Sequence, residues 1–228
     1  MTALTSRAHA NRRRIMDIAL TELLRHPDAT MDQIARAAGV VRRTVYGHFP
    51  SREALITALT DAAVDDVTTA FADGTADPSE PADVALARAT LAAWECADRY
   101  RLLVSLAQSN VTDAGIRARL EPVRRRATTI LTRGLGAGLF RSPLTPRALA
   151  HVHEHMLFGL MQAVNDGDLS AVAAGPAAAE TVLAAAGVPA ERVAEAVREA
   201  EASPVTGAAR ETGAAPETPD GRAAGPQG

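Results

Sequence analysis

The sequence predicts an all-helical protein, and three observations carry this prediction. Hydrophobic residues make up 47 % of the chain and aromatic residues only 3 %, and the Ala- and Leu-rich composition favours helix throughout. Apolar residues recur at helical spacing in one segment after another, and no stretch has a persuasive strand pattern. Gly and Pro residues separate these segments, as expected of the connections between helices.

The first expected helix covers residues 11–25. Ile15, Ala19 and Leu23 lie four residues apart on one stripe, which is the spacing of a buried helical face. Three arginines at 12–14 cluster at the beginning of this helix. Because cations at a helix N-terminus oppose the helix dipole, their position makes more sense if an external anion, such as a phosphate backbone, faces that end.

A short second helix is expected over residues 31–38. Thr30 and Gln33 have the spacing of a capping box, in which the Thr hydroxyl accepts from the Gln backbone N–H and the Gln side chain reaches back. Asp32 in the first turn suits the helix dipole. Gly39 supplies the left-handed residue that ends the helix.

A third helix is expected to follow directly and to stop at Pro50. Val45 and Phe49 lie four residues apart and can bury its inner face. The residues left on its outer face are Arg42, Arg43, Thr44, Tyr46, Gly47 and His48. A short helix with donors pointing outward can enter a DNA major groove. The three helices therefore indicate a supporting helix, a positioning helix and a recognition helix.

The distribution of charge agrees with this interpretation. Residues 1–52 hold nine Arg and four acidic residues, a net charge of +5, whereas residues 53–228 carry a net charge of −8. A basic head on an acidic body is typical of a protein whose head meets nucleic acid. The alternative is that the arginines form a solvated face and that Tyr46 belongs to the core.

Taken together, these features resemble the DNA-binding domain of the TetR family of transcriptional regulators. The resemblance covers about residues 13–59. It rests on the apolar stripe of the first helix and on Thr30, Ile34-Ala35, Ala38-Gly39-Val40, Thr44-Val45-Tyr46, His48-Phe49, Ser51-Arg52-Glu53 and Leu55. Such a combination is more specific than a short motif.

The resemblance and the outer face together give the expected contacts with double-stranded DNA. The contacting residues are Thr30, Arg42, Arg43, Thr44, Tyr46, Gly47, His48 and Arg52. Arg42 and Arg43 would contact phosphate and base edges, because one Arg can bind guanine O6 and N7 together. Thr44, Tyr46 and His48 would contact phosphates, Arg52 would touch the DNA backbone, and Thr30 would cap the second helix beside a phosphate.

Val41 departs from the family pattern, in which a small hydroxyl residue usually stands at this position. A Val side chain cannot accept a hydrogen bond from the helix N-terminus. We therefore expect the recognition helix to lack roughly 1 kcal/mol of local support.

Helices are also expected beyond the head. Their approximate ranges are 51–71, 82–97, 100–108, 116–135, 147–164, 169–186 and 190–202. Residues 73–81 should form a loop, and Gly175-Pro176 should break or restart the helix that contains it. The helix at 190–202 either docks on the body or belongs to the tail. In residues 203–228, nine of 26 positions are Gly or Pro, so a disordered tail is expected.

The expected domains are a DNA-binding head at 1–50, extended to about residue 60 by the start of the next helix, an effector-binding and dimerisation body at 51–202, and the tail. The single cysteine, Cys96, excludes an internal disulfide. The chain has no N-terminal apolar segment and no apolar run of membrane-spanning length. A cytoplasmic protein without a membrane partner is therefore expected.

The helix at 147–164 carries two adjacent apolar stripes and needs burial on two sides. The stripes are Leu149, Val152, Met156, Leu160 and Ala163, and His153, Leu157, Met161 and Val164. In the family, the last two body helices pair with those of a second subunit. The resemblance thus implies a homodimer whose recognition helices lie about 34 Å apart on a near-palindromic operator. The alternative is that these helices are ordinary monomer core.

The resemblance also implies a pocket in the body for a small effector that releases DNA. Candidate lining residues are Trp94, Tyr100, Phe140, His151, His155 and Phe158. They predict an aromatic, mostly apolar effector. Two His residues at this spacing can bind a metal, but no third ligand is identifiable, so neither a metal nor a cofactor is expected. For this His pair, pocket, interface and packing roles all stay open.

The sequence therefore predicts a sequence-specific DNA-binding regulator, namely a repressor released by a ligand. One alternative is a DNA-binding dimer without an effector. The other is an enzyme that uses Cys96 with a His as a nucleophile pair. The enzyme is disfavoured because a lone Cys in an apolar helix is usually a small buried hydrophobe. The sequence also contains no Gly-rich phosphate loop and no Gly-x-Ser-x-Gly elbow.

Overall fold

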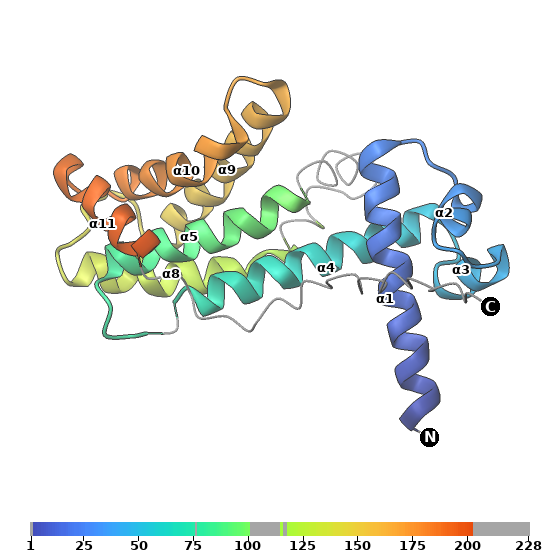
Figure 1. The fold of residues 1–228 in the computed structure, drawn as a ribbon. Helices are drawn as coiled ribbons and strands as arrows, with labels where there is room; N and C mark the ends of the chain where they lie inside the picture. The colour runs from blue at the N-terminus through green and yellow to red at the C-terminus, as the bar shows by residue number, and fades with distance from the viewer. Residues whose placement is uncertain (1, 76, 101–114, 116–117, 203–228) are drawn as a thin grey trace, which may run out of the picture.

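The computed structural model describes residues 2–75, 77–100, 115 and 118–202. Throughout these ranges the regular structure is helical, which confirms the predicted all-α class. In chain order the helices are α1 (Thr2–Arg25), α2 (Met31–Ala37), α3 (Arg42–His48), α4 (Arg52–Asp73), α5 (Ala82–Arg99), α8 (Glu121–Gly136), α9 (Pro146–Asp166), α10 (Ala171–Ala185) and α11 (Ala190–Ala202). Figure 1 shows α1, α2 and α3 at one end of α4, with the remaining helices around its other end.

The head packs α1, α2, α3 and the beginning of α4 around one buried cluster. Ile15 and Leu23 of α1, Ile34 of α2 and Val45 of α3 are all fully buried in it, so the predicted apolar stripe of the first helix is confirmed. The start of that helix differs from the prediction, because α1 begins at Thr2 and not at residue 11. Residues 2–10 contain neither Gly nor Pro, so nothing in their sequence stops the helix from extending.

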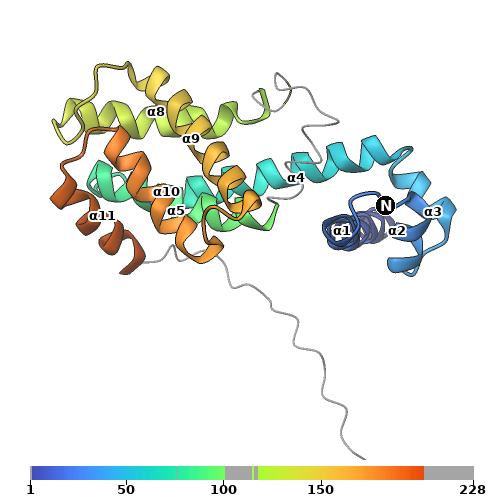
Figure 2. The same cartoon turned by 90° about the horizontal axis from the view of Figure 1, so that it is seen from above.

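A single long helix, α4, connects the head to the body (Figure 2). Ser51 caps it, since its Oγ accepts a hydrogen bond from the Ala54 N–H at 3.1 Å. Leu55 and Leu59 near its beginning belong to the buried cluster of the head. Phe71 near its end belongs to the buried cluster of the body. One continuous helix is therefore part of both cores.

In the body, α5 packs against α4, α8, α10 and α11. The last helix, α11, buries Val193 and Val197 in the body core, so it docks on the body and is not part of the tail. Its Arg192 Nε donates to Oδ2 of the buried Asp83 on α5 at 2.7 Å. Both apolar burial and a partly buried ion pair thus attach α11 to α5.

The predicted break at Gly175-Pro176 is wrong, because α10 runs without interruption through Pro176. The Pro ring removes one backbone hydrogen bond, to the carbonyl of Val172, and Val172 is strongly exposed. The buried Ala178 keeps the rest of the helix packed. Gly175 also has a packing reason, because a Cβ there would lie 3.3 Å from Trp94 Cδ1.

Some predicted segments fall at the edge of the described residues or outside them. Of the helix expected at 100–108, only Tyr100 is described, and it ends α5. Residues 116–117 of the helix expected at 116–135, and the whole tail at 203–228, lie outside the described residues. Among the helices that are described, none combines the length and apolar character needed to cross a membrane.

Candidate nucleic-acid interface and internal cavity

The junction between α2 and α3 is set by local hydrogen bonds. The capping box predicted at Thr30 is confirmed: the Thr30 N–H donates to Gln33 Oε1 at 2.8 Å, and the Gln33 N–H donates to Thr30 Oγ1 at 3.3 Å. Gly39 then adopts a left-handed backbone with φ of 64°, which favours Gly. The Val40 N–H donates to the Ala35 carbonyl at 3.0 Å. These bonds define the direction in which the chain enters α3.

The two faces of α3 differ as the sequence predicts. Val45 and, just after the helix, Phe49 are buried inward. The outward residues are Arg42, Arg43, Tyr46 and Gly47, which are exposed, and Thr44 and His48, which are half-buried. The helix starts after Val41, whose side chain makes no capping hydrogen bond. A row of donors is therefore presented on a helix whose other side is anchored in the core.

Arg42 is already held in place by two neighbours. Its Nη1 donates to Asp32 Oδ2 on α2 at 2.8 Å. Its guanidinium carbon lies 5.0 Å from the ring centroid of Tyr46, within the range of a cation–π contact. Its Nη2 also donates to the Tyr46 hydroxyl at 3.3 Å. Asp32 thus positions Arg42 at the front of α3, a role beyond the dipole effect expected from its sequence position.

Arg52 and Arg12 contact other residues of the head. The Arg52 Nε donates to the Ala29 carbonyl at 3.3 Å, and its Nη2 donates to the Pro27 carbonyl. Arg52 therefore ties the loop between α1 and α2 to the start of α4. Arg12 of α1 lies over Phe49, with its guanidinium carbon 4.9 Å from the ring centroid. Both arginines thus have partners within the head.

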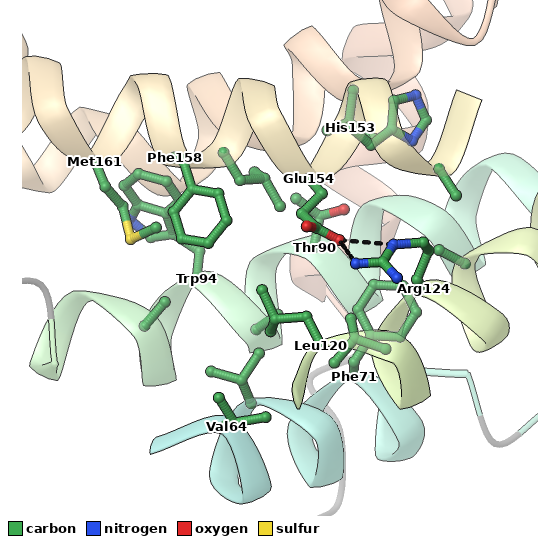
Figure 3. A pocket seen from close by; sticks show the side chains of 18 of the residues that line it. Val64, Phe71, Thr90, Trp94, Leu120, Arg124, His153, Glu154, Phe158 and Met161 are labelled. Atoms are coloured by element: carbon green, nitrogen blue, oxygen red, sulfur yellow. Dashed lines mark hydrogen bonds and ion pairs between the residues drawn. The ribbon is translucent and has the colours of Figure 1, made fainter. Parts of the chain in front are cut away.

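An internal cavity of about 150 Å³ lies in the body between α4, α5, α8 and α9. Apolar and aromatic side chains dominate its wall, and Figure 3 shows Val64, Phe71, Trp94, Leu120, Phe158 and Met161 around it. Most ligand pockets have such a wall and a few placed polar groups. Cys96, weighed above as a nucleophile, is half-buried on α5 and does not belong to the described wall.

Three of the six candidate pocket residues line this cavity, namely Trp94, Tyr100 and Phe158. Phe140 lies elsewhere, buried against Gly134, where a Cβ would clash with its ring at 2.1 Å. His151 and His155 lie on a neighbouring face of α9, and the exposed His155 places its Nδ1 2.9 Å from the His151 carbonyl oxygen.

The polar residues that α9 does bring to the cavity are His153 and Glu154, which sequence reasoning missed as a pocket pair. The face of α9 that lines the cavity is Ala150, His153, Glu154, Leu157, Phe158 and Met161. This spacing of three and four is that of one helical face. It could have been recognised from the apolar stripe of His153, Leu157 and Met161.

A buried ion pair crosses this cavity from α8 to α9. Arg124 is a buried residue, and its Nη2 donates to Glu154 Oε2 at 2.8 Å, with Nε at 3.0 Å. Its Nη1 also pairs with Glu121 on its own helix. Within the described residues, neither Glu154 Oε1 nor either ring nitrogen of His153 has a hydrogen-bond partner. Burial lowers the pKa of His153 to about 4, so its imidazole is neutral at pH 7.

Tyr100 lies where the cavity meets the head. It lines the cavity and also belongs to the buried cluster of the head. Its hydroxyl donates to Asp66 Oδ2 on α4 at 2.6 Å, and the same oxygen accepts from Arg99 Nη2 at 3.0 Å. Burial first, and then the bond to the Asp66 carboxylate, raise the pKa of Tyr100 to about 12. Tyr100 therefore stays protonated and remains a donor to α4.

The two apolar stripes of α9 face in different directions. His153 and Met161 are buried toward the body. Val152 of the other stripe is exposed, and Met156 and Leu160 are half-buried. Val172 on α10 is also exposed. The stripe of His153 and Met161 is thus satisfied within the chain, whereas the other stripe is buried at Leu149 and reaches the surface at Val152.

Comparison with known proteins agrees with this geometry. Residues 25–59 match the family model of bacterial regulatory proteins, tetR family. The HTH-type transcriptional repressor LfrR of Mycolicibacterium smegmatis is 42 % identical over 77 residues, which are 34 % of this chain and 40 % of LfrR. The uncharacterised HTH-type regulator TtgW of Pseudomonas putida is 54 % identical over 44 residues, 18 % of this chain and 33 % of TtgW. In both cases the match spans less than half of the relative's length.

Solved structures share the fold over about three quarters of this chain. The structure of LfrR from Mycobacterium smegmatis in complex with proflavine has a TM-score of 0.59 and 27 % identity, and covers 77 % of this chain and 95 % of its own. The structure of FadR from Bacillus subtilis in complex with stearoyl-CoA has a TM-score of 0.64 and 17 % identity. The match covers 76 % of this chain and 98 % of the FadR chain. At this identity, the FadR likeness concerns the fold alone.

Proposed function

We propose that the chain is a repressor of the TetR family of transcriptional regulators, whose family model its residues 25–59 match. It binds a specific operator as a homodimer and leaves the operator when a small aromatic ligand fills the cavity of the body. The observation that carries this proposal is the continuity between the two sites. Helix α4 and Tyr100 each belong to the core of the head and to the wall of the cavity. A ligand that moves the cavity wall must therefore act on the support of α3.

DNA reading is assigned to the head, residues 1–50 with the beginning of α4. The outer face of α3 carries Arg42, Arg43 and Tyr46 on a buried anchor. The net charge of +5 on residues 1–52 supports association with a phosphate backbone. Arg43 is exposed, and we assign it the contact with base edges. Arg42, paired with Asp32 and Tyr46, would approach the DNA with its guanidinium already oriented.

Ligand binding and dimerisation are assigned to the body, residues 51–202. The LfrR structure, which resembles this chain at 27 % identity, holds the aromatic compound proflavine. The cavity wall here offers Trp94 and Phe158 for a similar kind of molecule. The outward stripe of α9, with Val152, Met156 and Leu160, supports a two-fold pairing of α9 and α10. Exposed apolar faces of this kind often mark association surfaces.

The experiment that tests this function starts from the DNA. Duplexes bound by the full-length chain are selected from a random pool, and binding to the selected sequence is repeated at two salt concentrations. We expect a near-palindrome whose half-sites lie about one helical turn apart, and an affinity that falls steeply as salt rises. A set of selected duplexes with no common sequence would refute the assignment of the head as a sequence reader.

The repressor assignment needs a second readout. The selected operator is placed upstream of a reporter gene in cells that express the chain. We expect expression of the reporter to fall when the chain is present, and to stay unchanged with Arg43→Ala. A rise in expression would contradict repression while leaving the assignment of DNA binding intact.

A further inference from the structure

Within the described residues, the cavity wall has one charged patch, and apolar side chains make up most of the rest. Figure 3 shows the Glu154 carboxylate meeting the Arg124 guanidinium, with Trp94, Phe158 and Met161 grouped at the other side. Glu154 and Arg124 are the charged members of the described wall. Their side chains are only 11 % and 6 % exposed. Charges this deeply buried need nearly complete pairing.

Charge pairing around this patch is incomplete on the negative side. The Arg124 guanidinium contacts two carboxylates, those of Glu154 and Glu121. His153 adds no positive charge at neutral pH, because burial lowers its pKa. Among the described residues, one cation against two anions leaves the patch with an excess of negative charge. A second anion brought into the cavity would meet this excess in a medium that screens it poorly.

The buried polar atoms of the cavity that have no hydrogen-bond partner also favour a ligand that donates hydrogen bonds. Glu154 uses Oε2 for Arg124, whereas its Oε1 is buried and accepts from no group in the described part of the chain. A carboxylate oxygen can only accept. The neutral His153 offers one further unused acceptor and one unused donor. A ligand that pairs with these atoms of Glu154 and His153 therefore needs mainly N–H donors.

Resting on the proposed function, we propose that the effector is an aromatic cation with N–H donors. Its ring system packs against Trp94 and Phe158, and one of its N–H groups donates to Glu154 Oε1. Stacking of the cation on the indole face of Trp94 adds a favourable cation–π interaction to the binding energy. Glu154 is thus the residue that selects the charge of the ligand, and the aromatic pair selects its shape. Fatty acids and other apolar anions are excluded by the same patch.

The first test compares three probes on the wild-type, full-length chain. Proflavine supplies the aromatic cation, 9-anthracenemethanol the neutral ring system, and 9-anthracenecarboxylate the anion. Trp94 is the single tryptophan of the chain and lines the cavity, so quenching of its fluorescence reports binding there. We expect proflavine to bind roughly 10-fold or more tighter than the neutral probe, as for a charge-assisted hydrogen bond, and the anion to bind weakest.

The second test uses a matched pair of variants. Glu154→Gln removes the charge inside the cavity, and Glu121→Gln removes the charge on the other side of Arg124, outside the described wall. We expect Glu154→Gln to weaken proflavine binding roughly 10- to 100-fold and to leave 9-anthracenemethanol nearly unaffected. We expect Glu121→Gln to weaken proflavine binding clearly less than Glu154→Gln does, because the Glu121 side chain is 39 % exposed and its loss leaves the Glu154 acceptor in place. Thermal unfolding of both variants shows whether either change disrupts the body.

The outcomes separate this inference from the proposed function. Equal or tighter binding of the anion to wild type overturns the inference, and so does an equal loss from both variants. If Glu154→Gln does not fold, the order of the three probes on wild type decides. Binding of no probe overturns the inference as well. A probe of any charge that binds without changing operator affinity counts against the proposed function and leaves the charge preference standing.

Discussion

At the residue scale, the orientation of Arg42 depends on its neighbours before any DNA is present. Asp32 holds its Nη1 and the Tyr46 ring lies beneath its guanidinium. Such pre-organisation lowers the entropy lost when the side chain meets DNA. Arg43 next to it is exposed and is our candidate for reading a base. The two arginines are thus expected to differ in role although they are adjacent in sequence.

Substitution of Arg43 and Tyr46 should separate base reading from backbone binding. We expect Arg43→Ala to cost about 1–3 kcal/mol of preference for the selected operator over a duplex with one changed half-site base pair. We expect Tyr46→Phe to weaken binding to both duplexes by a similar factor, because a phosphate contact carries no sequence information. Fluorescence anisotropy with both duplexes measures this. An Arg43→Ala chain that keeps its full preference would contradict the assignment.

His153 should make the body sensitive to acid. Its folded pKa of about 4 lies below the ordinary value of 6.5, so the unfolded chain binds a proton first as the pH falls. Stability is therefore lost between these two pKa values, and the His153 contribution amounts to about 2 kcal/mol between pH 7 and pH 5. Urea unfolding at both pH values should show that His153→Leu removes this loss.

The matched control for this pH prediction is His155→Leu, on the same helix at an exposed position. We expect its pH dependence to equal that of wild type. If His153→Leu loses as much stability as wild type between pH 7 and pH 5, the acid sensitivity arises from other groups.

At the scale of elements, the start of α3 is a weak point that one substitution should repair. Val41 occupies the N-cap without a side-chain hydrogen bond and is 67 % exposed. We expect Val41→Ser to raise the free energy of unfolding of the head by about 1 kcal/mol, since the change buries nothing and adds an acceptor. Urea unfolding followed by circular dichroism measures it.

Two further substitutions frame this capping prediction. Val41→Ala removes the side chain without adding an acceptor and should leave stability nearly unchanged. Thr30→Ala removes the existing cap of α2 and should cost about 1 kcal/mol. A Val41→Ser chain no more stable than Val41→Ala would show that the α3 N-terminus already has another partner.

Local signals explain which elements could be predicted from sequence. The boundaries of α2 and α3 follow from Thr30, Gln33 and Gly39, whose effects act within one helical turn. The path of α10 through Pro176 could not be predicted, because it depends on the packing of Ala178 and on the fit of Trp94 against Gly175. These contacts join segments that are distant in sequence.

The cavity was only half predictable for the same physical reason. Trp94 and Tyr100 can be recognised because large aromatics are scarce in this chain, and Phe158 because it continues the helical face of His151 and His155. Glu154 gave no signal by itself, since its role depends on Arg124, which lies 30 positions earlier in sequence. The relative rotation of α8 and α9 decides which polar side chains meet, and helical periodicity alone gives no such rotation.

At the scale of the whole molecule, the outward stripe of α9 predicts the assembly state. Val152 is 39 % exposed there, so a longer polar side chain can be accommodated in the monomer. We expect Val152→Arg to convert a dimer into monomers, with a large loss of operator affinity because the two half-sites are no longer bound together. Light scattering coupled to size-exclusion chromatography gives the mass directly.

Leu144 provides the matched control for this dimer prediction. It is 40 % exposed and precedes α9 in sequence, so it is not a member of the outward stripe. We expect Leu144→Arg to leave the mass of the assembly unchanged. A wild-type chain that elutes as a monomer at every concentration would refute the α9–α10 pairing.

The central claim is that cavity and head are coupled through α4 and Tyr100. The most direct test titrates the selected operator against the full-length chain at increasing proflavine concentrations. The same experiment is then run in reverse, with proflavine titrated in the presence and absence of operator. Thermodynamic linkage requires the two ligands to weaken each other by the same factor, which is typically about 5- to 150-fold. We predict such a reciprocal loss. Proflavine that quenches Trp94 while the operator affinity stays constant would contradict it and would leave a DNA-binding dimer without an effector.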